Sequence, residues 1–182
     1  MKEARPRLIA VDGVEAAAVL AAARRALGSK DRAGISHWDA SGVFQDLAVA
    51  GETAGSPSPR TLLLLYAADL AFRLRWEIRP ALAEGHTVVA APYVETAVAF
   101  GRAAGVPAGW LANLFRFAPR PNERCFVHGS RKGDRAADGF IGFGCAQMRG
   151  RPGGRTPHQI IADAATELRK IAAKGKKVKV QR

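Results

Sequence analysis

The stretch "VDGVEAAAVLAAARRALG" (residues 11–28) has the pattern of a buried strand that turns into a helix. The apolar, β-branched segment "RLIAV" (residues 7–11) leads into it and is typical of a strand covered on both faces of a sheet. Gly13 marks the turn, and an alanine-rich helix is expected from Glu15 to Leu27, ended by Gly28. Many nucleotide-binding proteins hold a phosphate at such a strand–glycine–helix unit, so this stretch bears on function as well as on fold.

The rest of the chain alternates strands with helices of ordinary length. Further strands are predicted at residues 34–38, 86–91 and 124–129, an irregular Gly-rich region at residues 129–154, and helices at residues 59–85, 94–104, 107–117 and 156–173. Pro80 interrupts the first of these helices, so we expect a kink or a break there. This alternation predicts a single α/β domain over residues 1–173, with a central parallel sheet flanked by helices in three layers.

Composition indicates a globular domain that needs no disulfide or metal for stability. A chain of 182 residues suffices for one domain that buries about 70% of its unfolded surface. The apolar fraction of 48% argues against disorder, and no apolar run approaches the ~20 residues that span a bilayer. The opening residues "MKEARPRLIAVDG" lack the apolar core of a secretory signal. We therefore expect a cytoplasmic protein without a membrane partner.

Cysteine and histidine are too sparse to predict a metal site. Cys125 and Cys145 lie far apart with no CxxC pair, which is typical of two buried thiols rather than of a disulfide framework or a zinc site. The four histidines lack the spacing of metal ligands on a helix. Cys125 lies close to His128, which leaves open the hypothesis of an enzyme with a cysteine nucleophile here, although no third orienting group is identifiable.

Basic residues give the chain a formal net charge of +12, which attracts phosphate, nucleic acid or an anionic membrane. Seven basic and no acidic residues lie between Arg169 and Arg182, so residues 174–182 are predicted to form a flexible basic tail. A solvated tail is one interpretation. The other is a contact to DNA or RNA, with Phe126, Phe140 and Phe143 available for stacking.

The segment "SPRTLLLLYAADLAFRLRWEIRPALAEGHTVVAAPYVETAVAFGRAAGVPAGWLANLFRFAPRPN" (residues 58–122) resembles the thymidylate kinases, P-loop enzymes that transfer a phosphoryl group from ATP to dTMP. Members of that family carry stretches similar to "LLLFAADRAQH", "IRPALARG" and "DRYVDSSLAYQG" in the same order and at the same spacing. The strand, turn and helix at residues 8–27 extend the resemblance, and the C-terminal third departs from it. The resemblance implies a P-loop kinase-like fold and a homodimer.

The phosphate-binding loop of that family is not retained. Phosphoryl transfer needs backbone N–H groups and a lysine around the phosphates, and a hydroxyl that holds Mg²⁺. The family loop resembles "EGIDGSGKTT", whereas the matching stretch here reads "DGVEAAAVLA". Gly13 is kept as a remnant of the turn, but Ala16 and Ala18 replace glycines. Val19 replaces the lysine and Leu20 replaces the hydroxyl residue, so the loop is not expected to hold ATP.

Charges that the family uses elsewhere are also missing. The "DRY" triplet, whose aspartate and arginine serve metal and phosphate, is Ala91, Pro92 and Tyr93 here. The arginine of "ADR", which faces the dTMP phosphate, is replaced by Leu70, while Asp69 is kept. Because a single transition-state arginine contributes ~10³ to 10⁵ in rate, these combined losses predict no ATP-dependent kinase activity.

Four residues of the acceptor pocket are retained, and the resemblance implies a remnant dTMP pocket formed by them. Tyr66 matches the aromatic residue that stacks on thymine in the family, and Tyr93 keeps the tyrosine of the triplet. Thr96 keeps a hydroxyl near the base-binding region, and Asp69 completes the set. Core packing is the alternative for each of them, and Asp69 has the further alternative of pairing with a nearby arginine.

The retained scaffold and the lost charges predict a catalytically inactive thymidylate kinase-like protein that acts as a binding or interaction module. No cofactor and no metal are expected. The alternative is a basic, nucleic-acid-associated accessory protein that reuses the kinase scaffold.

Overall fold

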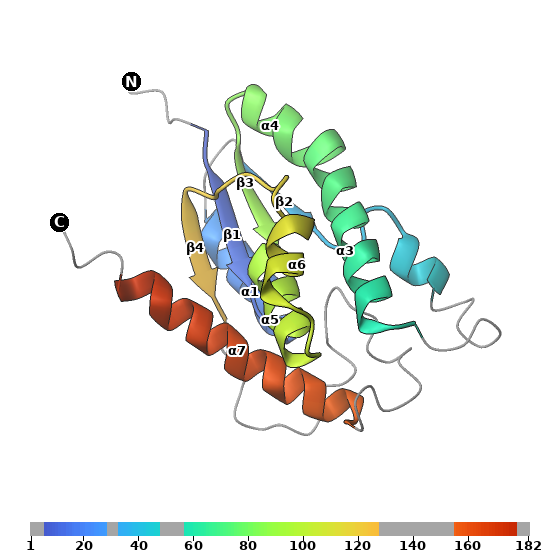
Figure 1. Ribbon diagram of the computed structural model, residues 1–182. Coiled ribbons are helices and arrows are strands. Elements are labelled where there is room, and N and C mark those ends of the chain that lie inside the picture. The colour runs from blue at the N-terminus through green and yellow to red at the C-terminus, as the bar shows by residue number, and fades with distance from the viewer. Residues whose placement is uncertain (1–5, 29–32, 48–56, 128–154, 178–182) are drawn as a thin grey trace.

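The computed structural model describes residues 6–28, 33–47, 57–127 and 155–177 (Figure 1). Its strands are β1 (Leu8–Asp12), β2 (Ala33–His37), β3 (Thr87–Ala91) and β4 (Glu123–Phe126). Its helices are α1 (Ala16–Leu27), α3 (Pro59–Arg73), α4 (Arg79–Ala83), α5 (Val94–Ala103), α6 (Ala108–Leu114) and α7 (Pro157–Lys177), with a π-helix η1 (Leu74–Ile78) between α3 and α4.

The four strands form one parallel sheet in the order β2-β3-β1-β4. β1 pairs on one side with β3, where Ile9 lies opposite Val89, and on the other side with β4, where Val11 lies opposite Cys125. Since all four strands run in the same direction, their carboxyl ends lie at one edge of the sheet. Ligands of open parallel sheets bind at this edge.

Alternating side chains of the strands divide the core into two layers. Leu8 and Ala10 of β1 belong to the cluster that contains residues of α3, α5 and α7. Ile9 and Val11 belong to a second cluster with α1. Figure 1 shows α1 behind the sheet and α5, α6 and α7 in front of it. The α/β fold in three layers that we expected is thus confirmed.

The helix predicted over residues 59–85 begins as expected but changes type before Pro80. Ser58 caps it by accepting a hydrogen bond from the backbone N–H of Thr61 at 3.1 Å. From Leu74 the helix widens into η1, where the N–H of Arg79 reaches back to the carbonyl of Leu74. A proline ring clashes with the carbonyl four residues before it, and a wider turn relieves that clash.

The last helix begins close to its predicted start and continues to Lys177, past the end that we expected at Ala173. Residues 174–177 of the predicted basic tail are therefore helical, and residues 178–182 lie outside the described part. The Gly-rich region predicted at residues 129–154 also lies outside it, and so do His128, Cys145, Phe140 and Phe143, which were singled out above.

Close packing of α5 on α6 gives a direct test of this fold. A Cβ atom on Gly101 would lie 2.5 Å from Cδ2 of the buried Leu111 and 3.2 Å from Cδ1 of the buried Leu63. We expect Gly101→Ala to lower the free energy of unfolding by about 1–2 kcal/mol, because overpacking costs ~1–3 kcal/mol and better helix propensity returns up to ~1 kcal/mol.

The matched control is Gly109→Ala in α6, where an added Cβ atom meets nothing within 4 Å. This variant should be neutral or slightly more stable in urea unfolding, since only the propensity effect acts. Equal changes in the two variants would contradict the packing of α5 against α6.

Candidate functional site

The side chain of Asp12 joins the end of β1 to the first turn of α5. Its Oδ1 atom accepts hydrogen bonds from the backbone N–H of Tyr93 at 2.9 Å, the backbone N–H of Thr96 at 3.0 Å and the hydroxyl of Thr96 at 2.9 Å. Tyr93 holds the N-cap position of α5 without a side-chain cap, so Asp12 supplies from a strand the acceptor that the helix start needs. Burial raises the pKa of Asp12 to about 6, against the opposing effect of these donors.

The turn between β1 and α1 is short and closed. Only residues 13–15 separate the two elements, and the N–H of Val19 is already bonded to the carbonyl of Glu15 at 3.0 Å. The N–H of Gly13 donates to the Thr96 hydroxyl at 3.0 Å. The side chain of Val19 is 0% exposed, and a Cβ atom on Gly13 would lie 2.6 Å from its Cγ2 atom. Val19 therefore packs directly against Gly13.

A buried ion pair connects α3 to the edges of β2 and β3. Nε of Arg73 donates to Oδ2 of Asp69 at 3.0 Å, and both side chains are 0% exposed. The guanidinium also donates twice to the carbonyl of Pro92, at 3.2 Å each, and once to the carbonyl of Ser36 at 3.4 Å. Oδ1 of Asp69 accepts from the N–H and the hydroxyl of Ser41. Removing one partner of such a pair costs ~3–5 kcal/mol, because it leaves an uncompensated buried charge.

Tyr66 and Tyr93, the two tyrosines of the predicted pocket, are both hydrogen-bonded to backbone carbonyls near Asp12 and Arg73. The Tyr66 hydroxyl donates to the carbonyl of Tyr93 at 2.6 Å, and the Tyr93 hydroxyl donates to the carbonyl of Pro119 at 2.8 Å. Phe115 packs edge-on against Tyr66, with ring centroids 6.1 Å apart. Burial raises the pKa of both hydroxyls. Tyr66 is 0% exposed, so neither face of its ring is open to solvent.

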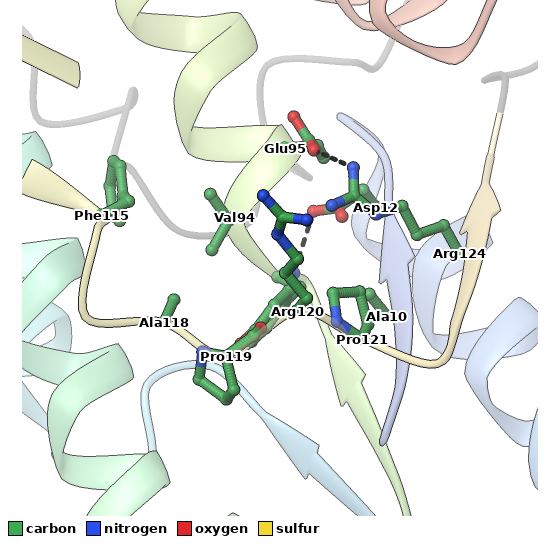
Figure 2. Close-up of a pocket in the computed structure, with 11 residues that line it drawn as sticks. Ala10, Asp12, Val94, Glu95, Phe115, Ala118, Pro119, Arg120, Pro121 and Arg124 are labelled. Carbon is green, nitrogen blue, oxygen red and sulfur yellow. Dashed lines mark hydrogen bonds and ion pairs between the residues drawn. The ribbon is translucent and has the colours of Figure 1, made fainter. Parts of the chain in front are cut away.

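A small charged pocket lies between β1, the start of α5 and the segment before β4 (Figure 2). Glu95 and Arg124 form an ion pair at its rim, and Figure 2 shows Arg120 extending toward Asp12 and Glu95. Its volume is about 80 Å³. A water needs ~10–15 Å³ of such space, so the pocket has room for a few waters. Sites for drug-sized ligands run from about 300 to 1,000 Å³, which is well above this volume.

The structure brings together all four residues predicted to form the remnant dTMP pocket. The hydroxyl of Thr96 and the backbone N–H of Tyr93 donate hydrogen bonds to Asp12, and the hydroxyl of Tyr66 donates to the carbonyl of Tyr93. Asp69 forms an ion pair with Arg73, which is the alternative to substrate binding given above for Asp69. All four are buried and bonded within the protein. Their role in binding a substrate stays a prediction.

Sequence reasoning missed Asp12, and it foresaw an arginine partner for Asp69 without naming Arg73. An acidic residue that directly follows a buried strand signals a group at the carboxyl edge of the sheet. Asp69 and Arg73 have the i,i+4 spacing that pairs side chains along a helix. The sequence contains both patterns, but comparison with the family motif "ADR" singled out Leu70, which stands at the position of its arginine.

The described residues add no support for a metal site or for a cysteine nucleophile. No cluster of three or more His, Cys, Asp and Glu side chains suited to a metal occurs within the described ranges. No helix in the same ranges is long and apolar enough to cross a membrane. Cys125 is half-buried in β4 as a free thiol, and its neighbour His128 falls outside these ranges.

Asp12 predicts a distinctive pH dependence of stability. Its pKa in the folded chain is about 6, above the ordinary 3.8, so the folded state holds a proton that the unfolded chain releases. The stability that Asp12 contributes is therefore present below about pH 4 and lost as the pH rises through about 6, by up to about 3 kcal/mol at ~1.4 kcal/mol per pH unit. Asp12→Asn keeps the Oδ1 acceptor and does not titrate.

Urea unfolding of both proteins from pH 4 to pH 7 measures this effect. The free energy of unfolding of Asp12→Asn should rise relative to wild type across this interval, because the wild type alone loses the Asp12 contribution. A difference that stays constant with pH would show that the Asp12 carboxyl does not titrate there.

Comparisons with known proteins agree with this architecture. No family model matches the chain. It is 36% identical to a probable thymidylate kinase of Pyrobaculum calidifontis over 80 residues, which make up 44% of this chain and 40% of that protein. It is 41% identical to a probable thymidylate kinase of Pyrococcus horikoshii over 59 residues, 32% of this chain and 29% of that protein. The matches thus span two fifths or less of the length of these relatives.

A solved structure shares the fold over nearly the whole chain. The thymidylate kinase from Ehrlichia chaffeensis superposes with a TM-score of 0.65 over 94% of this chain and 89% of that protein, at 10% identity. The parallel sheet between helices is therefore the P-loop kinase-like α/β fold that the sequence predicted. The chain is thus similar in part of its sequence to probable thymidylate kinases, and it shares the fold of a thymidylate kinase over nearly its whole length.

Proposed function

We propose that this chain is a catalytically inactive thymidylate kinase-like protein that acts as a binding or interaction module. The packing of Val19 against the short turn between β1 and α1 carries the proposal. Only residues 13–15 connect the two elements, and the buried side chain of Val19 packs against Gly13. A phosphate held in a P-loop needs an open turn with backbone donors directed into it.

One backbone donor of this turn, the N–H of Gly13, is already engaged. The N–H of Gly13 bonds to Thr96, and the N–H of Val19 bonds within α1. Glu15 holds the N-cap position of α1, where the family loop also carries an acidic residue. The helix start itself keeps only the weak attraction that a helix N-terminus has for an anion.

Groups that stabilise the transition state are absent at the matching positions. Phosphoryl transfer depends on a cation beside the phosphates and on Mg²⁺ held by oxygen ligands. Val19 and Leu20 supply neither, and β3 ends in the buried Ala91 rather than in a charged residue. The buried guanidinium of Arg73 is bonded to Asp69 and to two carbonyls, which supports a structural role for this cation.

A coupled assay with ATP, Mg²⁺ and dTMP tests the inactivity. We expect ADP formation equal to that of a blank without protein, and no rise in melting temperature with Mg·ATP, because a ligand stabilises a protein only if it binds the folded state. The control is Ala16→Trp, which places a large side chain on the turn without entering the buried core. Turnover that is lost in Ala16→Trp would overturn the proposal, whereas turnover that survives it reports a contaminating kinase.

An apolar stripe on α3 and η1 supports the interaction role. Leu64, Phe72 and Trp76 are 52%, 39% and 65% exposed. With Ala68 between them they follow an i, i+4 spacing, which places them on one face of the helix. A single exposed leucine is ordinary, but three large apolar side chains on one face indicate an interaction surface. We propose a second copy of the chain as the partner, since two-fold dimers are the commonest assemblies and pair one such patch with itself.

Sedimentation equilibrium measures this association. Leu64→Glu and Trp76→Glu should each weaken dimerisation at least tenfold, about 1.4 kcal/mol, because they place a charge in the apolar contact. Phe117→Glu is the matched control, since Phe117 is 37% exposed but lies outside the stripe. A monomeric wild type, or equal weakening by the control, would contradict the dimer.

A further inference from the structure

The last helix, α7, is held against the core along one side and faces solvent along the other. Ile160 and Ile161 belong to the core cluster that contains residues of α5, and Leu168 is also buried. Figure 1 shows α7 in front of the sheet, with its C-terminal half beside β4. The direction in which the exposed side points is therefore fixed by packing.

The exposed side of α7 is basic in its second half. Arg169, Lys170 and Lys174 are all exposed. With 3.6 residues per turn, these three positions fall within an arc of about 140° on the side of the helix opposite to Leu168. The helix continues to Lys177, and the sequence from Leu168 to its end contains no acidic residue. This arrangement gives one helix face a single sign of charge.

The carboxylates of α7 do not neutralise this face. Glu167 is paired with Lys170 at 2.6 Å, and Asp163 is paired with an arginine before the helix at 3.2 Å. Arg169 and Lys174 make no hydrogen bond or ion pair through their side chains with any other residue that the structure describes. Both cations are therefore available to a partner, and the partner that complements them is an anion.

The other exposed side chains on this part of α7 are small. Thr166, Ala173 and Gly175 are exposed, and none of the large exposed apolar side chains of the described chain lies on α7. The face thus offers no ring for stacking on a base and no apolar group for insertion into a lipid layer. Arg169 and Lys174 are separated by about 7.5 Å along the helix axis, close to the ~6.8 Å that two base steps span along one strand of a duplex.

We propose that this basic face of α7 binds the sugar-phosphate backbone of duplex nucleic acid without reading its sequence. Arg169 and Lys174 each contact a phosphate, and Lys170 joins them by exchanging its pair with Glu167, since a surface ion pair adds little free energy. Contacts of this kind release counterions and carry no sequence information. The face shares no residue with the turn after β1 or with the apolar stripe on α3 and η1, so this proposal goes beyond the proposed function and is tested separately from it.

Fluorescence anisotropy of a labelled DNA duplex of mixed sequence, titrated with the full chain, measures this contact. Between about 50 and 200 mM NaCl, the logarithm of the association constant should fall linearly with the logarithm of the salt concentration. The double variant Arg169→Gln and Lys174→Gln should weaken binding at least tenfold at the lower salt concentration. It should also reduce the slope by about 2, because each phosphate contact contributes ~0.9. Absence of binding by wild type, or an unchanged slope in the variant, would overturn the proposal.

The matched control is the double variant Arg24→Gln and Arg25→Gln, which removes the same charge from α1. Both arginines are exposed, and Figure 1 shows α1 on the face of the sheet opposite to α7. This variant should keep the slope of wild type and nearly its affinity. Equal weakening by the two double variants would mean that the net charge of the chain attracts the duplex, and the proposal would be rejected.

Urea unfolding shows whether the variants are folded. Glutamine has nearly the helix propensity of arginine and lysine, so both double variants should unfold as cooperatively as wild type. If the α7 double variant does not, the single variant Lys174→Gln is read in its place, and it should reduce the slope by about 1. An unchanged slope in that folded variant would contradict the phosphate contact.

Two further probes separate the duplex from other polyanions. A single-stranded oligonucleotide should bind more weakly, because α7 offers it no aromatic ring and its charge density is lower. Vesicles of phosphatidylcholine and phosphatidylserine should not sediment with the chain, because nothing apolar on this face enters a lipid layer. Tighter binding of either probe than of the duplex, lost in the α7 double variant, would overturn the proposal. Turnover in the kinase assay bears only on the proposed inactivity.

Discussion

The carboxylate of Asp12 is buried at the junction of two elements, and the rest of the carboxyl edge depends on it. Placing a charge in a site that is 1% exposed costs free energy, and three donors from Tyr93 and Thr96 offset that cost. The same contacts fix the start of α5. With Tyr93 fixed, its carbonyl receives the Tyr66 hydroxyl, and the neighbouring Pro92 carbonyl receives the Arg73 guanidinium. One strand end therefore organises side chains from two helices, α3 and α5.

The two faces of β1 have opposite chemistry at this edge. On the face toward α5, polar side chains bond to one another and to backbone carbonyls. On the face toward α1, Val19 packs with Val11 and Val89 in an apolar cluster. Gly13 lies between the two, donating its N–H to one side and leaving room for Val19 on the other. The turn thus serves packing on both sides of the strand.

The sequence predicted the fold well because its signals there are local. Buried β-branched strands, a serine cap with Pro59, and glycines at helix ends each report on a few adjacent residues, and all were found close to their expected positions. The widened helix at Leu74 was harder to foresee, since the proline that causes it acts through the preceding turn. Family motifs identified Tyr66 and Thr96 but passed over Arg73, because its burial depends on carbonyls from β2 and from the residue after β3. Contacts between distant segments carry no local signal in the sequence.

Val19 also restricts which residues this turn accepts. A lysine at this position would bring an ammonium group into a cluster built by Ile9, Val11 and Val89, and an unpaired buried charge costs several kcal/mol. The side chain at position 19 and the length of the turn are therefore coupled through packing, so a basic residue fits there only if the turn changes with it.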